Sequence, residues 1–187
     1  MKRLNLPGLA LSLAFAAISA NMKAQDAISD NHDITITIPS VAILDIEPSA
    51  SKNISMGFTA PTEAGLPIAV AATNNTLWLN YSSIKTATVT TRHISAKLDA
   101  LIPGVDIKVT AAAAVGGAGA LGTPSTLTLT ATDQSLISLI GSAYTEDGSG
   151  KGHNLTYTIT PGTTTAYGNI TATANVTAKV TYTFVDN

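Results

Sequence analysis

The pattern closest to a known chemical motif is a glycine-rich run in the second half of the chain. Gly117-Ala118-Gly119-Ala120-Leu121-Gly122 has the three glycines of a dinucleotide-binding loop at the correct spacing. That loop holds a pyrophosphate because it opens a helix whose N-terminal N–H groups face the ligand. Here Thr123-Pro124 and a threonine-alternating stretch follow instead, which favours a strand. We therefore interpret 115–124 as a flexible surface loop and expect no cofactor.

A second glycine-rich segment, 141–154, partly matches a phosphate-binding loop and a calcium-binding loop. Gly150-Lys151 could end a phosphate-binding loop, but Thr145 stands where that motif requires its first glycine. Glu146-Asp147 supplies oxygen ligands of the kind calcium prefers, although two carboxylates are few for such a site. We expect a solvated hairpin loop without metal, and a calcium site around Glu146-Asp147 stays the open alternative.

Residues suited to catalysis are scattered along the chain. The three histidines, His32, His93 and His153, are isolated, and no pair has metal-ligand spacing. Nucleophilic catalysis needs a base beside an activated serine, and the Gly-x-Ser-x-Gly elbow is absent from the sequence. A catalytic triad can also form from residues that are far apart in the sequence, and on this ground His93 and Asp99 stay candidates. We expect a protein that is not an enzyme.

The aromatic residues suggest a binding surface. Trp78 is the only tryptophan, and period-two alternation places it opposite Leu77, Leu79 and Tyr81. A tryptophan on a strand is usually a plug in the core, and the alternative is an exposed platform for a sugar ring. In that alternative, Trp78, Tyr81 and Tyr144 are the candidate ligand contacts, together with the two glycine-rich loops.

These side chains must be positioned by strands, because the dominant pattern is alternation of apolar residues with threonine. The longest such stretch is Asn169 to Asp186, which we expect to be one long half-buried strand. We expect 68–72 and 76–81 to pair as a hairpin around Thr73-Asn74-Asn75. The shorter predicted strands are 34–38, 41–46, 52–58, 68–72, 76–81, one or two within 86–98 (the first around Val89 and the second over 93–98), 105–114, 125–131 and 155–160, with 135–140 as a strand or one helical turn.

Short strands separated by turn signals about every ten residues predict an all-β fold. We expect an antiparallel two-sheet β-sandwich of the immunoglobulin or pilin kind, with about nine to eleven strands, in a single domain over 25–187. The chain contains no cysteine, so core packing alone must hold this domain.

The N-terminus has the form of a secretory signal peptide, which we place at 1–24. Lys2 and Arg3 precede an apolar run that is too short for a membrane span, and small residues allow cleavage after Ala20 or Ala24. Cleavage after Ala24 leaves seven basic against twelve acidic residues, a net charge of −5. We expect a secreted, cell-surface or periplasmic protein that binds no nucleic acid and does not span a membrane.

The first segment after the signal alternates Ile34, Ile36 and Ile38 with threonine and ends at Pro39. An unpaired strand with one apolar face is a template for strand addition. These isoleucines are therefore the candidate strand donor, and the expected partners are further copies of this chain or other surface proteins.

Several segments resemble known surface proteins. Trp78-Leu79-Asn80-Tyr81, Ile34 to Pro39 and Val41 to Glu47 are similar to segments of uncharacterised secreted β-sandwich proteins of Gram-negative bacteria. Val180 to Asp186 resembles the last strand of WxL cell-wall-binding domains, with Tyr182 in the tryptophan position. Asp33 to Pro39 resembles the donor strand of chaperone-usher pilins. Because the polar residues are spread as solvent-facing Thr, Ser and Asn instead of being gathered into one cluster, we expect an exported, non-catalytic structural or adhesive protein of the bacterial cell surface or envelope, such as a pilus or fibre subunit. The alternative is a glycan- or small-ligand-binding module that uses Trp78 and the glycine-rich loops.

Overall fold

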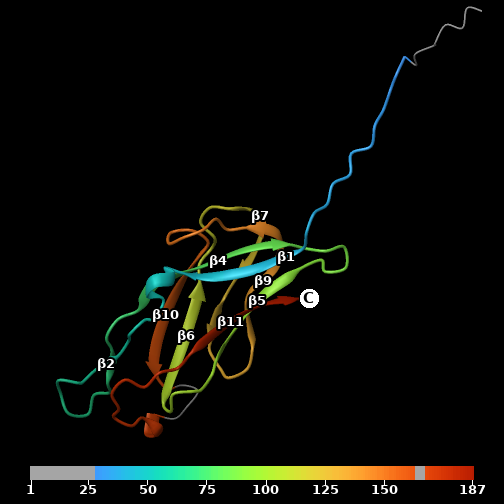
Figure 1. Cartoon of the computed structure of the whole chain (residues 1–187). Helices are drawn as coiled ribbons and strands as arrows, with labels where there is room; N and C mark the ends of the chain where they lie inside the picture. Colours follow the sequence, from blue (N-terminus) through green and yellow to red (C-terminus); the bar gives the residue numbers. More distant parts are fainter. Residues whose placement is uncertain (1–27, 163–166) are drawn as a thin grey trace, which may run out of the picture. The chain divides into compact units, whose positions relative to one another are not determined.

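The structure is a computed structural model that describes residues 28–162 and 167–187, and its regular elements are almost all β-strands (Figure 1). Two 3-10 turns, Ser49–Ser51 and Tyr167–Asn169, are the helical elements of these ranges. Within the described ranges, no helix has the length and hydropathy to cross a membrane. The strands are β1 (Val41–Glu47), β2 (Phe58–Thr59), β3 (Ala69–Val70), β4 (Asn74–Ile84), β5 (Arg92–Leu98), β6 (Val105–Ala111), β7 (Ala118–Pro124), β8 (Thr126–Thr128), β9 (Gln134–Tyr144), β10 (His153–Pro161) and β11 (Val180–Asp186).

The strands form an antiparallel sandwich whose two layers are joined by hydrogen bonds. One layer has the order β1-β4-β10-β6-β8, and the other contains β11-β5-β9 with β7 on the far edge of β9. The layers connect where Ser82 and Ser83 of β4 pair with Tyr144 and Ala143 of β9, so nine strands form one continuous sheet. β2 and β3 form a separate two-stranded sheet. The prediction of an all-β sandwich is confirmed.

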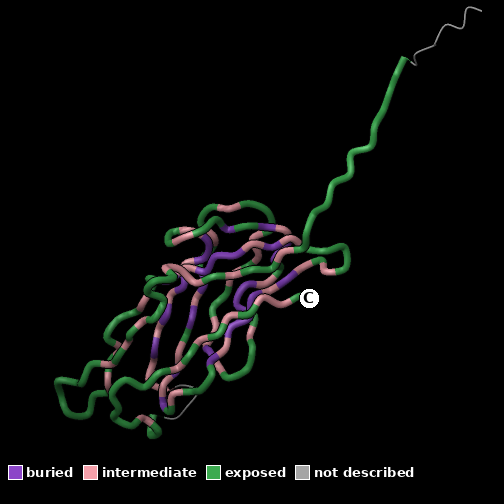
Figure 2. The backbone as a smooth tube through the Cα atoms, viewed as in Figure 1, coloured by how far each residue is buried: buried purple, intermediate pink, exposed green. Residues whose placement is uncertain are grey.

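The core lies between these layers and is built from the alternation that the sequence shows. Leu77, Leu79 and Tyr81 of β4 are buried, whereas Trp78 on the opposite face is half-buried. The buried residues lie mainly on the central strands, as Figure 2 shows in purple. The two layers touch through Tyr81, whose ring packs edge-on against Phe184 at 5.7 Å, and through the hydroxyl pair of Tyr157 and Tyr182. The interpretation of Trp78 as a core plug is wrong.

Several predicted elements differ from the structure because alternation does not fix a strand's partner. Of the predicted strand 52–58, only Phe58 lies in a strand, as the first residue of β2. The predicted hairpin between 68–72 and 76–81 is wrong, because β3 pairs with β2. The predicted loop 115–124 contains β7, and the predicted loop 141–154 begins inside β9. The predicted long strand 169–186 is regular only over β11.

The segment before β1 is the most exposed apolar stretch of the described chain. Residues 38–187 form one compact unit. Ile34, Ile36 and Ile38 are 74–76% exposed and belong to no strand, so the prediction of a regular strand at 34–38 is wrong. The predicted signal peptide, 1–24, lies outside the described residues.

Candidate functional site

The residues considered for catalysis are held apart, each by its own partner. His93 Nδ1 lies 2.5 Å from the side-chain oxygen of Asn187, and the Asp99 carboxylate accepts a hydrogen bond from the Lys179 N–H at 2.7 Å. That hydrogen bond lowers the pKa of Asp99. His153 is buried, with Nδ1 2.7 Å from the Ala112 carbonyl, and burial lowers its pKa. The candidate pair of His93 and Asp99 is therefore engaged in structural contacts at opposite ends of β5.

The carboxylates of the 146–147 loop serve the loop itself. Glu146 pairs with the Lys151 ammonium and accepts a hydrogen bond from the Gly117 N–H at 3.2 Å. The Lys151 hydrogen bond first, and the Gly117 bond second, hold the pKa of Glu146 below its usual range, so this carboxyl group is ionised at neutral pH. Over the described parts of the chain, no group of three or more carboxylate or histidine side chains is placed to hold a metal ion. The calcium alternative gains no support.

The glycine-rich run is explained by close packing of β7 on β9. Gly117 and Gly119 have φ values of 76° and 90°, in the region that favours glycine. A Cβ atom at Gly117 would lie 2.0 Å from the Tyr144 carbonyl oxygen, and one at Gly119 would lie 2.2 Å from that of Ser142. These glycines thus let β7 approach the end of β9, which positions Tyr144. Close packing of β7 on β9 therefore explains the glycine spacing that matches a nucleotide-binding motif.

The three aromatic candidates occupy different environments. Tyr81 is 4% exposed; its hydroxyl donates to the Leu121 carbonyl and its ring stacks on His153 at 5.7 Å. Burial raises the pKa of Tyr81 far above its usual value. Tyr144 is 53% exposed on the outer face. Trp78 lies on the outer face of β4, between Glu47 of β1 and Asn154 of β10. Tyr144 is therefore the candidate with the most accessible ring.

A groove runs over β4 between two of its neighbours, and we call it the Tyr144 groove. Ile43, Ser82 and Tyr144 stand opposite one another in a row across β1, β4 and β9. Ile43 is 64% exposed, so two large side chains rise on either side of a small serine. Two adjoining depressions of about 340 and 350 Å³ share Ser82 and Tyr144. The first is also lined by Ile43, Leu44, Asp45, Asn80, Tyr81, Glu146 and Asp147, and the second by Val41, Ser83, Ile84, Ala118, Gly119, Ser142 and Ala143.

The polar groups at one end of the Tyr144 groove are fixed by hydrogen bonds. The buried Asn80 side chain donates to the Lys151 carbonyl at 2.7 Å and accepts from the Gly148 N–H at 3.0 Å. Asp45 accepts a hydrogen bond from the Ile46 N–H at 2.7 Å. The other end, towards Val41 and Ile84, is apolar. The groove therefore has a rigid frame with an acidic end and an apolar end.

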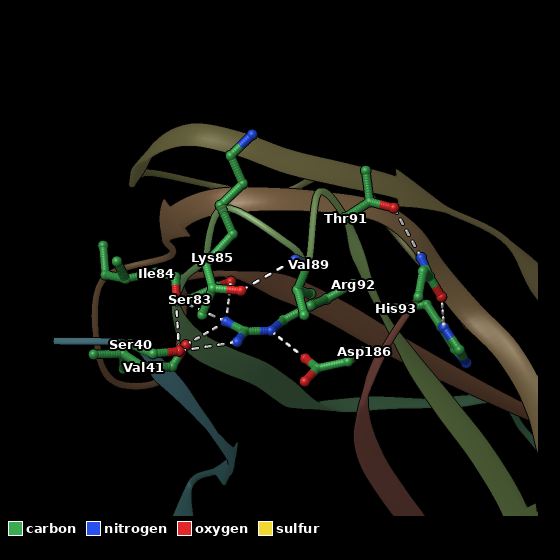
Figure 3. A network of polar contacts seen from close by, with 12 residues as sticks. Ser40, Val41, Ser83, Ile84, Lys85, Val89, Thr91, Arg92, His93 and Asp186 are labelled. Carbon is green, nitrogen blue, oxygen red and sulfur yellow. Dashed lines mark hydrogen bonds and ion pairs between the residues drawn. The ribbon is translucent and has the colours of Figure 1, made fainter.

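A buried arginine contacts residues of three neighbouring strands, as Figure 3 shows, and two of its partners, Val41 and Ile84, line the apolar end of the groove. Arg92 of β5 is 3% exposed and forms an ion pair with Asp186 of β11 at 2.5 Å. Its Nη1 donates to the carbonyls of Val41 and Ile84, and its Nη2 donates to the Ser40 hydroxyl. Nη1 also lies 3.2 Å from the Ser83 hydroxyl, so the three nitrogens of the guanidinium make contacts with five groups and form a structural clasp. We did not identify this residue from the sequence, although Arg92 falls on the same face as Ile94 and Leu98, and a cation in an apolar row is a usable signal.

Comparisons with known protein families, curated proteins and solved structures found no match.

Proposed function

We propose that the mature chain is an exported, non-catalytic structural or adhesive subunit of the bacterial cell surface or envelope, which assembles by donating its N-terminal segment to another copy. The observation that carries the proposal is the exposure of Ile34, Ile36 and Ile38, each about three-quarters accessible. Three alternating isoleucines form one apolar face when the chain is extended. Exposing that face to water is costly, and burial against another strand removes the cost.

Acceptor edges exist on the folded unit. In the described residues, β1 and β11 each pair with a single strand, so each has one edge without a strand partner beyond the end where Arg92 joins Val41 of β1 to Asp186 of β11. Their inward-facing side chains, which include Leu44 and Phe184, are only half-buried, whereas those of the central strands are buried. A donated strand at either edge would gain main-chain hydrogen bonds and would cover this apolar surface.

The experiment compares the mature chain, beginning at Gln25, with a chain that begins at Ser40. We expect the longer chain to form oligomers or fibres, seen by light scattering and electron microscopy, and the shorter chain to remain monomeric. A triple Ile34→Ser, Ile36→Ser, Ile38→Ser variant should also stay monomeric because it loses the apolar face.

The matched control changes the other face of the same segment. Thr35→Ser with Thr37→Ser leaves the isoleucines in place, so this variant should assemble as the unmodified chain does. Donation by this segment is refuted if the chain beginning at Ser40 forms the same assemblies as the full mature chain. It is also refuted if the full mature chain stays monomeric at high concentration.

A further inference from the structure

We propose that the Tyr144 groove is a binding site for an uncharged or amino-bearing saccharide, with one pyranose ring held between Ile43 and Tyr144. This inference goes beyond the proposed assembly and does not depend on it. It also moves the candidate site away from the Trp78 and Tyr81 side chains that the sequence suggests, and retains Tyr144.

The width of the groove suits a ring. Neighbouring strands lie about 4.8 Å apart, so the backbones that carry Ile43 and Tyr144 are separated by about 9.6 Å, across the Ser82 strand. The thickness of the two side chains leaves a slot with the small Ser82 as its floor. A saturated ring has two faces of C–H groups, which pack on an aromatic ring and on an aliphatic side chain.

The length of the groove suits more than one sugar unit. The two depressions meet at Ser82 and Tyr144 and together follow β4 from Asn80 to Ile84. Each has a volume at the lower end of the range typical of small-molecule pockets. Ser82 lies in both depressions and Ser142 in the second, so an oligosaccharide finds mainly apolar contact along the groove, and the hydrogen-bonding carboxylates lie at its acidic end.

The charges at one end select among saccharides. Asp45, Glu146 and Asp147 line that end, and Lys151 pairs with Glu146, so these four side chains carry a formal charge of −2. Carboxylates accept hydrogen bonds from sugar hydroxyls and attract an ammonium group. They repel the carboxylate of a uronic acid. The groove is therefore suited to neutral and amino sugars and unsuited to acidic ones.

The frame of the site is rigid before any ligand arrives. Asn80 is buried with its side-chain oxygen and nitrogen both hydrogen-bonded, and the buried Thr145 hydroxyl accepts a hydrogen bond from the Tyr81 N–H at 2.8 Å. Gly117 and Gly119 fix the close approach of β7 behind Tyr144. A site that is already ordered loses little conformational entropy on binding.

The test titrates the mature chain with defined tetrasaccharides by calorimetry: cellotetraose, maltotetraose and mannotetraose as neutral probes, the glucosamine tetramer as an amino probe, and tetragalacturonate as an acidic probe. We expect at least one neutral or amino probe to bind with a dissociation constant of about 1 mM or tighter, and tetragalacturonate to bind at least tenfold more weakly. Trp78, two residues from Asn80 on the same face of β4, gives an independent fluorescence signal.

Variants locate the site. Tyr144→Ala should weaken binding by about tenfold, as loss of ring contact predicts, and Ile43→Ser should weaken it by a smaller factor. Tyr167→Ala removes an exposed tyrosine outside the groove and serves as the matched control, and Trp78→Phe should also leave the calorimetric affinity unchanged. The proposal is overturned if no neutral or amino probe binds, if tetragalacturonate binds best, or if Trp78→Phe abolishes binding while the folded Tyr144→Ala and Ile43→Ser variants both retain it.

Discussion

Two segments of this chain have nearly the same alternating pattern and opposite environments. Residues 34–38 place isoleucines at every second position, and β11 does the same with Val180, Tyr182 and Phe184. β11 pairs with β5 along its whole length and packs against the core, whereas the isoleucines of 34–38 are exposed and in no strand. The alternating pattern shows that a segment is suited to form a half-buried strand. Whether it finds a strand to pair with depends on the rest of the fold.

What distinguishes β11 is the set of contacts made by its inward side. Phe184 meets the Tyr81 ring edge-on, and the Arg92 guanidinium lies 5.9 Å from the centre of the Phe184 ring. Asp186 closes the same end through its ion pair with Arg92. The comparison therefore predicts that stability depends on the neighbours of β11 and is insensitive to changes at 34–38.

The largest effect is expected when the arginine clasp is removed. Arg92→Met removes the donor to the Val41 carbonyl and the ion-pair partner of Asp186, and it leaves the Ile84 carbonyl with the Ser40 hydroxyl alone. These lost hydrogen bonds and the lost packing of a buried side chain should lower the free energy of unfolding by about 2–4 kcal/mol. Lys97→Met, on the opposite face of β5 in an exposed pair with Asp133, should cost less than about 1 kcal/mol. Urea unfolding measures both, and equal losses would contradict the structural role of Arg92.

The next effect compares the two alternating segments directly. Phe184→Ala removes a half-buried ring and should lower the free energy of unfolding by about 2 kcal/mol. Ile36→Ala alters a side chain that is 76% exposed and should change it by no more than about 0.5 kcal/mol. Both are measured by urea unfolding of monomeric protein, separated from any assemblies. A loss at Ile36 as large as that at Phe184 would mean that 34–38 packs on its own domain.

A smaller effect is expected from pH, through the histidine beneath Tyr81. Burial lowers the pKa of His153 below its ordinary value of 6.5, so the unfolded chain binds this proton more readily. The stability it contributes is complete above about pH 6.5. It declines as the pH falls from there through the lower pKa of the folded state.

Urea midpoints at pH 7.5, 6 and 5 test this dependence. His153→Gln should flatten the decline, and His93→Gln, which removes a partly exposed histidine, is the matched control variant. The carboxylates with lowered pKa values, Asp99, Asp133 and Glu146, titrate below this window. If His153→Gln keeps the full decline, another group is responsible.

The sequence predicts the fold class and the inward faces of single strands, because alternation is a local property. Leu77, Leu79 and Tyr81 are buried as expected, with Trp78 on the other side. Pairing is not local: β3 joins β2, and β7 occupies a run that composition alone assigns to a loop. The Tyr144 groove could not be predicted either, because its walls come from β1 and β9, which become neighbours of β4 only in the folded sheet.

The smallest effect concerns a third alternating stretch, which precedes β11. Val176 continues the pattern of Val180 and was predicted to lie in the same strand, yet it is 51% exposed and in no strand. Val176→Thr keeps the shape of the side chain and should change the free energy of unfolding by no more than about 0.5 kcal/mol. Val180→Thr places a hydroxyl against the core and should cost about 1 kcal/mol or more. Urea unfolding of the two variants distinguishes the effect of the alternating pattern from that of the surrounding residues, because the substitution is the same and only the neighbouring side chains differ. Equal losses would place Val176 against the core, and the boundary of β11 at Val180 would then be wrong.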